Sequence, residues 1–327
     1  MKGGIWIHST SHFGSSKPSD IEEALKKLKD AGFSLIIPCV KNPDGLLDYH
    51  SKVGKIRDKF KNWDPLEKIC EFASKLNLKV HPWLCVFTES SSSKLIEKNP
   101  SLWLVSSEGH KNEKWGWVCA INPEVQEYEY SLYEEILENY PVDGVHLDYI
   151  RTGSFCYCDY CNSRIKEKTG KSLFEIKLNE TGKDFEIWMK WREKNITEFV
   201  GRISKKAKEL DKEVSVAVFR DYPSCVEGQG QNWKSWAERK FVDYIFPMTY
   251  TNNLTLFKEY SRVHKIVIGN SAHLWEGIGR KSSMSNLDEK QLEEQIKSIK
   301  ELGIEGVVIF SYAGLQESDF KIFKKYF

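Results

Sequence analysis

The chain has 327 residues, of which 40% are hydrophobic and 29% are charged, the balance of a globular protein and not of a disordered one. Its 48 lysines and arginines against 47 aspartates and glutamates leave a formal net charge of +1, so the composition indicates neither a nucleic-acid partner nor an anionic membrane. The longest apolar runs, such as residues 307–310, have the length of a strand and exclude a transmembrane helix. Residues 1–7 contain no apolar signal segment, and we therefore expect a cytoplasmic protein.

Short strands alternate with longer helices along the chain. We expect strands over 4–8, 33–40, 78–87, 142–150, 213–221, 242–250, 265–270 and 304–312. The helices expected between and after them cover 20–30, 66–76, 122–140, 185–210, 233–240, 256–263, 289–302 and 318–326. The run Asn122-Pro123-Glu124 is typical of a helix start, with a capping side chain, a proline in the first turn and an acid near the helix dipole.

Eight strands, each followed by a helix, predict a parallel sheet closed into a (β/α)8 TIM barrel. The alternative is an open doubly wound sheet, but no glycine-rich phosphate loop follows the first strand. No linker divides the chain, so we expect one domain over residues 1–327, with a Cys-rich loop insertion at 152–183 after the fourth strand. The loops after strands two, three and four are long and should lie at the carboxyl-terminal mouth, where such barrels build active sites.

Strand alternation identifies the side chains that point into the barrel. Asp148 and Asp221 then emerge at the carboxyl ends of adjacent strands, and Glu276 follows the expected strand at 265–270. We predict Asp148 as the first catalytic candidate, Asp221 as its partner and Glu276 as the reserve. The side chains predicted to bind substrate around them are His8, His81, Trp83, His146, Arg151, Tyr250, Trp275 and Tyr312.

Carboxylates, histidines and aromatic rings at one barrel mouth are typical of a glycosidase. Glycoside hydrolysis needs one carboxyl group to protonate the leaving oxygen and a second to attack the anomeric carbon or to activate water. We therefore expect a carbohydrate substrate and a two-carboxylate mechanism. Two alternatives stay open: a catalytically inactive glycan-binding barrel that lacks the second carboxylate, and a metal-dependent hydrolase that uses His8, His81 and His146.

Three of the eight cysteines form a Cys-x-Cys-x2-Cys cluster, at Cys156, Cys158 and Cys161, shortly after the fourth strand. A closed structural zinc site takes four sulfur or nitrogen ligands, so a fourth must come from elsewhere. Cys119, just before the helix that leads into the fourth strand, is the candidate. We predict a structural Zn²⁺ that stabilises the long loop and performs no chemistry; free thiols are the alternative.

Three segments, at 119–125, 142–149 and 243–250, resemble the glycosyl-hydrolase-like, family-10-like glycosidases, which are (β/α)8 barrels. The four cysteines are similar in arrangement to those of the family-42 β-galactosidases, which hold zinc, and this resemblance implies a zinc site here. That family places an Asn-Glu acid/base where this chain has Leu147-Asp148. The fourth strand also resembles that of chitinase-like barrels, but Ile150 stands at the position of their catalytic Glu, which argues against their substrate-assisted mechanism.

Overall fold

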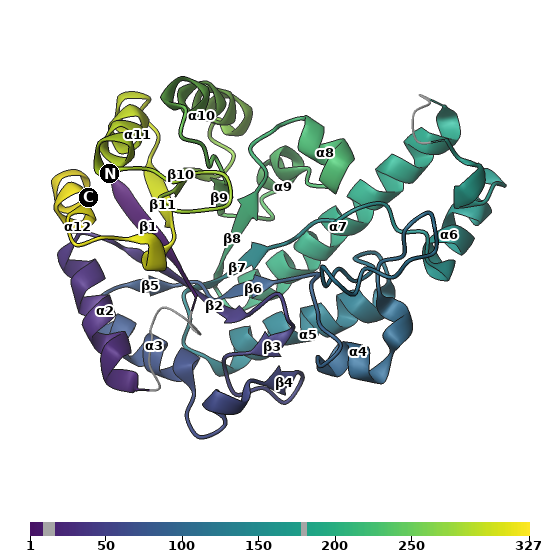
Figure 1. The fold of residues 1–327 in the computed structure, drawn as a ribbon, viewed down its shortest axis with the longest axis horizontal. Helices are drawn as coiled ribbons and strands as arrows, with labels where there is room; N and C mark the ends of the chain where they lie inside the picture. The colour runs from purple at the N-terminus through teal and green to yellow at the C-terminus, as the bar shows by residue number, and fades with distance from the viewer. Residues whose placement is uncertain (9–16, 178–181) are drawn as a thin grey trace.

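The computed structural model describes residues 1–8, 17–177 and 182–327, and within them eight parallel strand positions close into a barrel (Figure 1). In chain order the barrel strands are β1 (Lys2–His8), β2 (Leu35–Lys41), β5 with β6 (Lys79–Val80 and Trp83–Cys85), β7 (Gly144–Asp148), β8 (Glu213–Val218), β9 (Tyr244–Pro247), β10 (His273–Gly279) and β11 (Gly306–Phe310). The ring closes because β1 pairs in parallel with both β2 and β11. The predicted TIM barrel is confirmed.

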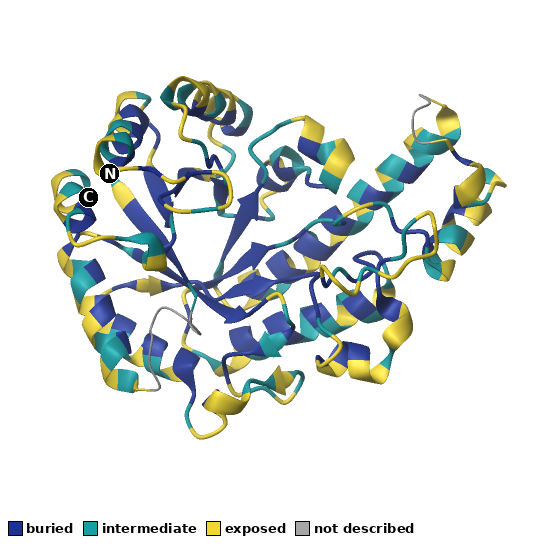
Figure 2. Ribbon diagram, in the orientation of Figure 1, coloured by how far each residue is buried: buried dark blue, intermediate teal, exposed yellow. Residues whose placement is uncertain are grey.

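Helices surround the barrel and turn their buried faces toward it (Figure 2). They are α2 (Pro18–Asp30), α3 (Pro65–Lys75), α4 (Lys94–Lys98), α5 (Pro123–Asn139), α6 (Asp159–Thr169), α7 (Lys183–Glu209), α8 (Ser224–Gln229), α9 (Trp233–Glu238), α10 (Leu254–Ile268), α11 (Glu289–Glu301) and α12 (Asp319–Tyr326). The Asn122 side chain caps α5 as predicted, since it accepts a hydrogen bond from the backbone N–H of Glu124. Across the described part of the chain, each helix is too short or too polar to cross a membrane.

The loops at the mouth contain structure of their own. The loop after β2 holds the short strands β3 (Leu46–Leu47) and β4 (Lys55–Ile56) and the 3-10 turn η1 (Asp58–Phe60); the turn η2 (Pro100–Leu102) lies in the loop after β6. The expected Cys-rich insertion at 152–183 contains α6 and η3 (Leu173–Glu175), and α6 lies with the start of α7 beyond the ring of helices (Figure 1).

The prediction for the seventh strand was wrong. Residues 265–270 were expected to form it, but residues 265–268 are the last turn of α10, and the strand is β10. The run Lys265–Ile268 contains β-branched residues, which favour strands. Its side chains nevertheless follow helical spacing, because His264 and Ile268 are buried while Ile266 is 81% exposed.

Polar side chains fill part of the barrel interior. The indole Nε1 of Trp6 donates to Nε2 of His146 at 3.0 Å, and His146 Nδ1 lies 2.9 Å from the hydroxyl of Ser215. His81 Nδ1 contacts the same hydroxyl at 3.0 Å. Because burial lowers the pKa of His146, with a smaller effect from His81, the ring is neutral and Nδ1 donates to Ser215. This layer closes the barrel beneath its mouth.

A buried charged cluster supports the loops after β2 and β6. Lys41, at the end of β2, is fully buried, and its ammonium lies 2.8 Å from Glu129 of α5 and 2.9 Å from Glu89. It also donates to the backbone oxygens of Cys85, Val86 and Thr88 at 2.8–3.0 Å. One cation is thus shared by two buried carboxyl groups at the base of the mouth.

Candidate active site

A pocket of about 430 Å³ opens at the carboxyl-terminal ends of the strands. Its lining comes from the ends of β1, β6, β7, β8 and β11 and from the loops that follow the strands. The residues are Trp6, His8, Pro43, Trp83, Asp148, Tyr149, Arg151, Ala217, Phe219, Arg220, Asp221, Met248, Tyr250, Ser282, Ser283, Met284 and Phe310. Within this described lining, the carboxylates are Asp148 and Asp221.

Asp148 is the last residue of β7 and is 7% exposed. Its Oδ1 accepts a hydrogen bond from the backbone N–H of Tyr149 at 2.6 Å and lies 3.7 Å from a guanidinium nitrogen of Arg151. Burial raises the pKa of Asp148 above its ordinary value, while Arg151 and the Tyr149 N–H act in the opposite direction. A carboxyl group in this setting is suited to donate a proton.

Asp221 lies in the loop after β8, and its side chain is 46% exposed. Its Oδ1 accepts a hydrogen bond from the hydroxyl of Tyr260 at 2.6 Å, and Oδ2 lies 3.8 Å from Nε of Arg220. Arg220 is held in turn by the backbone oxygen of Tyr250, at 2.7 Å. The two pocket carboxylates therefore differ, since one is buried and the other is solvated and paired with a cation.

Glu276 does not line this pocket. It lies in the middle of β10, fully buried, where its carboxylate accepts hydrogen bonds from Thr249 and from Nδ1 of His264, the latter at 3.0 Å. His264 also contacts the backbone oxygen of Arg220 at 2.8 Å, so both ring nitrogens face acceptors. Burial alone would lower the pKa of His264, but the nearby carboxylate of Glu276 has the larger effect and the pKa is raised overall. The two side chains therefore form a buried ion pair behind the barrel wall.

The structure separates the predicted binding residues into two groups. His8, Trp83, Arg151 and Tyr250 line the pocket. His81, His146 and Trp275 are buried inside the barrel, and Tyr312 lies in the turn η4 (Tyr312–Gly314) outside the pocket lining.

Arg151 is set among aromatic rings. The centre of its guanidinium lies 4.4 Å from the ring of Tyr149, 4.9 Å from Phe219 and 5.2 Å from Trp117. Its Nη1 is buried and makes no hydrogen bond within the described residues. The rings therefore hold a donor group beside Asp148 at the wall of the pocket.

Several lining residues were not predicted as site residues. Arg220 lies two residues beyond Val218, the last residue of β8, where strand alternation no longer determines the direction of a side chain. Residues 282–284 lie in the loop after β10. Because the seventh strand was expected at 265–270, this loop was not recognised as part of the barrel mouth. Met248 and Phe310 lie at the carboxyl ends of β9 and β11. Their position at the strand ends is the feature of the sequence that could have identified them as pocket residues.

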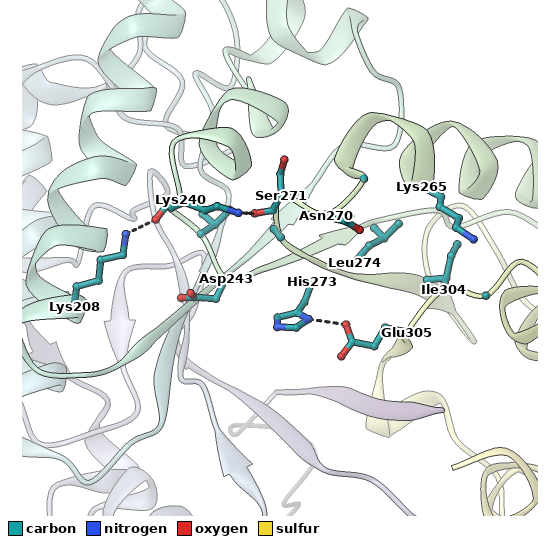
Figure 3. Close-up of a pocket in the computed structure, with 14 residues that line it drawn as sticks. Lys208, Lys240, Asp243, Lys265, Asn270, Ser271, His273, Leu274, Ile304 and Glu305 are labelled. Atoms are coloured by element: carbon teal, nitrogen blue, oxygen red, sulfur yellow. Dashed lines mark hydrogen bonds and ion pairs between the residues drawn. The ribbon is translucent and has the colours of Figure 1, made fainter.

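A second hollow, of about 520 Å³, lies at the opposite, amino-terminal end of the strands (Figure 3). It contains His273. His273 begins β10, and its Nδ1 contacts Glu305 at 2.6 Å. The lysines at this hollow donate to backbone oxygens, as Lys240 does to Ser271 at 2.7 Å, so their ammonium groups are already paired.

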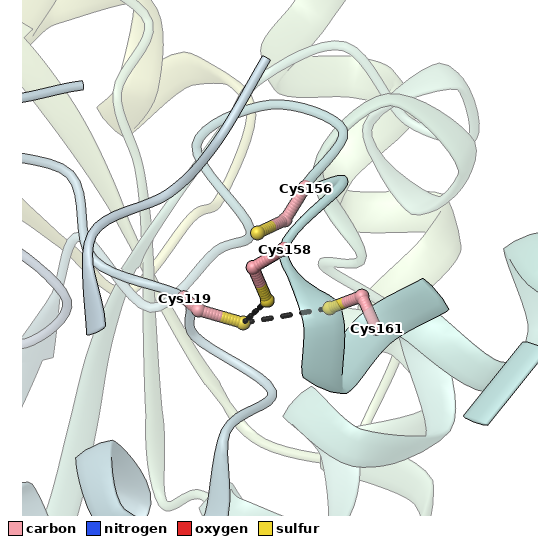
Figure 4. Close-up of side chains that lie close together, drawn as sticks. All are labelled: Cys119, Cys156, Cys158 and Cys161. Atoms are coloured by element: carbon pink, nitrogen blue, oxygen red, sulfur yellow. Dashed lines mark hydrogen bonds between the residues drawn. The ribbon is translucent and has the colours of Figure 1, made fainter. Parts of the chain in front are cut away.

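The four predicted metal ligands lie together (Figure 4). Their sulfur atoms are all within 4.8 Å of one another, with 3.4 Å between Cys119 and Cys161 and 3.7 Å between Cys119 and Cys158. Tetrahedral zinc with bonds of about 2.3 Å requires sulfur atoms roughly 3.8 Å apart, so these residues fit such an ion. Among the described residues, this is the one group of His, Cys, Asp and Glu side chains placed to hold a metal, and the three histidines of the metal-hydrolase alternative form no such group.

Comparisons with known proteins agree with this architecture. The family profile described as glycosyl hydrolase-like 10 matches residues 2–293. The glycosyl hydrolase DigH of Escherichia coli O6:H1 (strain CFT073) is 25% identical over 268 residues, which cover 70% of this chain and 57% of DigH. The chain thus spans a little over half the length of this curated relative.

Among solved structures, the glycoside hydrolase domain of PgaB (BpsB) from Bordetella bronchiseptica superposes with a TM-score of 0.80 at 12% identity, over 99% of this chain and 98% of that domain. A β-galactosidase from Bacillus circulans sp. alkalophilus gives 0.71 at 15% identity, over 100% of this chain and 55% of that one. These similarities show the shared barrel fold. With the family match, they confirm the resemblance of the chain to the glycosyl-hydrolase-like, family-10-like barrels.

Proposed function

Because the chain belongs to the glycosyl hydrolase-like 10 family, we propose that it hydrolyses a glycosidic bond of an oligo- or polysaccharide with Asp148 and Asp221. The observation that carries the proposal is the presence of two carboxylates of different character in one pocket at the barrel mouth. A glycan-binding barrel without catalysis would lack the second carboxylate.

The two carboxyl groups have separate roles in this proposal. Asp148 is the general acid, because burial raises its pKa and so favours the protonated form that the leaving oxygen requires. Asp221 is the base or nucleophile, because its carboxylate is solvated and faces the guanidinium of Arg220. Glu276 has no part, since it is paired with His264 outside the pocket.

The pocket walls suit a sugar ring. Trp83, Tyr250 and Phe310 offer aromatic faces, and Arg151 and His8 offer polar groups between them. Burial lowers the pKa of His8, against the effect of a hydrogen bond with Asn42, so its ring is neutral near pH 7. We propose that these groups bind hydroxyls of the substrate.

Substitution of each carboxylate tests the assignment. On unactivated glycosides, Asp148→Asn and Asp221→Asn should each lower turnover by about 10²–10⁴-fold. A dinitrophenyl glycoside needs no proton on its leaving group, so Asp148→Asn should retain most of its cleavage while Asp221→Asn loses it. Asp58→Asn, a surface residue paired with Lys61, is the control. Full activity of Asp148→Asn on an unactivated substrate refutes its role; binding of glycans by a wild-type protein that cleaves none favours the non-catalytic alternative.

We further propose that Cys119, Cys156, Cys158 and Cys161 hold a structural Zn²⁺. Bound there, the ion would fix the loop after β7 to the segment before α5 and supply no chemistry to the pocket. Metal analysis should give one zinc per chain, lost in Cys158→Ser and kept in Cys225→Ser, a buried thiol outside the cluster. Loss of zinc in neither variant would refute the site.

A further inference from the structure

Arg192, on α7, lies beside the cysteine cluster and is 2% exposed. It lines a small internal cavity together with Cys119, Cys156, Cys161 and Trp188. Its guanidinium also packs 4.3 Å from the ring of Phe155. Within this cavity's described lining, Arg192 is the one cationic side chain.

The charge of Arg192 has no carboxylate partner among residues 1–8, 17–177 and 182–327. Its guanidinium donates to the hydroxyl of Thr152 and to the backbone oxygens of Glu227 and Gly228, at 3.1 and 3.3 Å. These are neutral acceptors, and a buried cation is unfavourable without a negative group nearby. Four thiolates around a divalent ion carry a net charge of −2, which is the missing counter-charge.

The partners of Arg192 belong to the two loops that carry the pocket residues. Thr152 follows Arg151 directly, and its backbone N–H donates to the oxygen of Gln229 at 3.1 Å. Glu227 and Gly228 lie in α8, whose start is tied to Asp221 by a hydrogen bond of 2.9 Å from the N–H of Cys225. Arg192 therefore faces the cysteine cluster across the small cavity on one side and joins the loops after β7 and β8 on the other.

We propose that Arg192 is a positioning residue, which balances the charge of the metal–tetrathiolate centre and fastens to it the two loops that place Arg151 and Asp221. This inference rests on the proposed zinc site and the proposed hydrolase function. Through Arg192, the cysteine centre would influence the positions of Arg151 and Asp221 in the pocket.

Metal affinity tests the charge. Zinc competition with a chromogenic chelator should give a dissociation constant about 10- to 100-fold weaker for Arg192→Met than for the wild type. Arg192→Lys keeps the charge and should recover most of that loss. Arg202→Met is the control on the same helix, because Arg202 is exposed and paired with Glu127. An Arg192→Met affinity within twofold of the wild type, or an equal loss in Arg202→Met, overturns the proposal.

Hydrogen exchange tests the fastening of the loops. In zinc-loaded Arg192→Lys, peptides covering 149–158 and 221–231 should exchange faster than in the wild type, because lysine cannot bind Thr152 and the two backbone oxygens together. Thr152→Val, which removes the hydroxyl acceptor, should speed exchange in the first peptide with zinc affinity kept. Both variants should raise KM more than they lower kcat. Unchanged exchange in both overturns the positioning role.

The outcomes distinguish failure of the zinc site or of the hydrolase function from failure of the role of Arg192. A wild-type protein that binds no zinc overturns the metal site and this inference together. A wild type that binds zinc through Cys158, with Arg192→Met unaffected, overturns the role of Arg192 alone. Loss of zinc affinity in Arg192→Met with no hydrolysis by the wild type supports the charge role and removes the hydrolase proposal.

Discussion

Replacing Lys41 with methionine removes the cation from a cluster that contains two buried carboxyl groups. In the native protein the ammonium contacts both Glu89 and Glu129, and all three side chains are fully buried. Breaking a buried ion pair by removing one partner costs about 3–5 kcal/mol, because a charge remains without compensation. We expect Lys41→Met to lower the free energy of unfolding by this amount.

The same cluster predicts a much smaller effect for Glu129→Gln. Burial raises the pKa of Glu129, Glu89 raises it further and Lys41 opposes both, so Glu129 holds its proton to higher pH than an ordinary glutamate does. Glutamine resembles this protonated acid and leaves one cation facing one carboxylate. We expect a cost of about 0.5–1.5 kcal/mol, the net contribution of a hydrogen bond.

The sign of the pH dependence follows from the raised pKa. The native state binds this proton more tightly than the unfolded chain, so its contribution is full below the ordinary glutamate value of about 4.3 and is lost as pH rises toward the native pKa. As pH rises above the ordinary glutamate value, the wild type should therefore lose stability relative to Glu129→Gln.

Urea unfolding followed by tryptophan fluorescence measures these differences. Lys61→Met, at a surface lysine paired with Asp58, is the control and should stay within about 0.5 kcal/mol of the wild type. Equal costs for Lys41→Met and Glu129→Gln would refute the reasoning, because they would mean that Glu129 is a charged partner of Lys41 and not a protonated acid.

Three further substitutions test the site and the barrel interior. Arg151→Met removes a charge that lowers the pKa of Asp148, so the alkaline limb of the kcat/KM profile should move to higher pH; a limb that does not move contradicts the acid role of Asp148. Gly153→Ala places a Cβ against the ring of Trp117 at a backbone φ of +64° and should cost more than about 1 kcal/mol in urea unfolding, whereas a neutral effect would show that the Trp117 ring can move aside. Trp6→Phe leaves the buried Nε2 of His146 without its donor and should cost about 1–3 kcal/mol; a cost near zero would mean that water replaces the indole.

Strand alternation predicted the part of the site that lies on regular strands. Trp83 and Asp148 were placed correctly because the pleat fixes the direction of each side chain. The same rule put His81 and His146 inside the barrel, but it does not state how far below the mouth they lie. Alternation gives the face of a residue and not its depth.

The positions of residues that lie beyond the strands could not be predicted by the same rule. We expected Glu276 at the mouth because the β-branched run at 265–268 favours a strand. This run instead forms the last turn of the amphipathic helix α10. Tertiary packing decides between the two structures in such a run. For Arg192 the sequence predicts only a place in a long amphipathic helix, since nothing local in the sequence indicates that it shares a cavity with cysteines far along the chain.

Under the proposed function, the layer of side chains beneath the pocket determines how a sugar would enter and leave. Since Trp6, His146, Phe246 and Trp275 occupy the axis of the barrel, no saccharide can pass through it from one end to the other. A cleaved sugar held on the floor must then depart by the route that the next substrate takes. Accumulated product should therefore compete directly with incoming glycan, and release should slow turnover as hydrolysis proceeds.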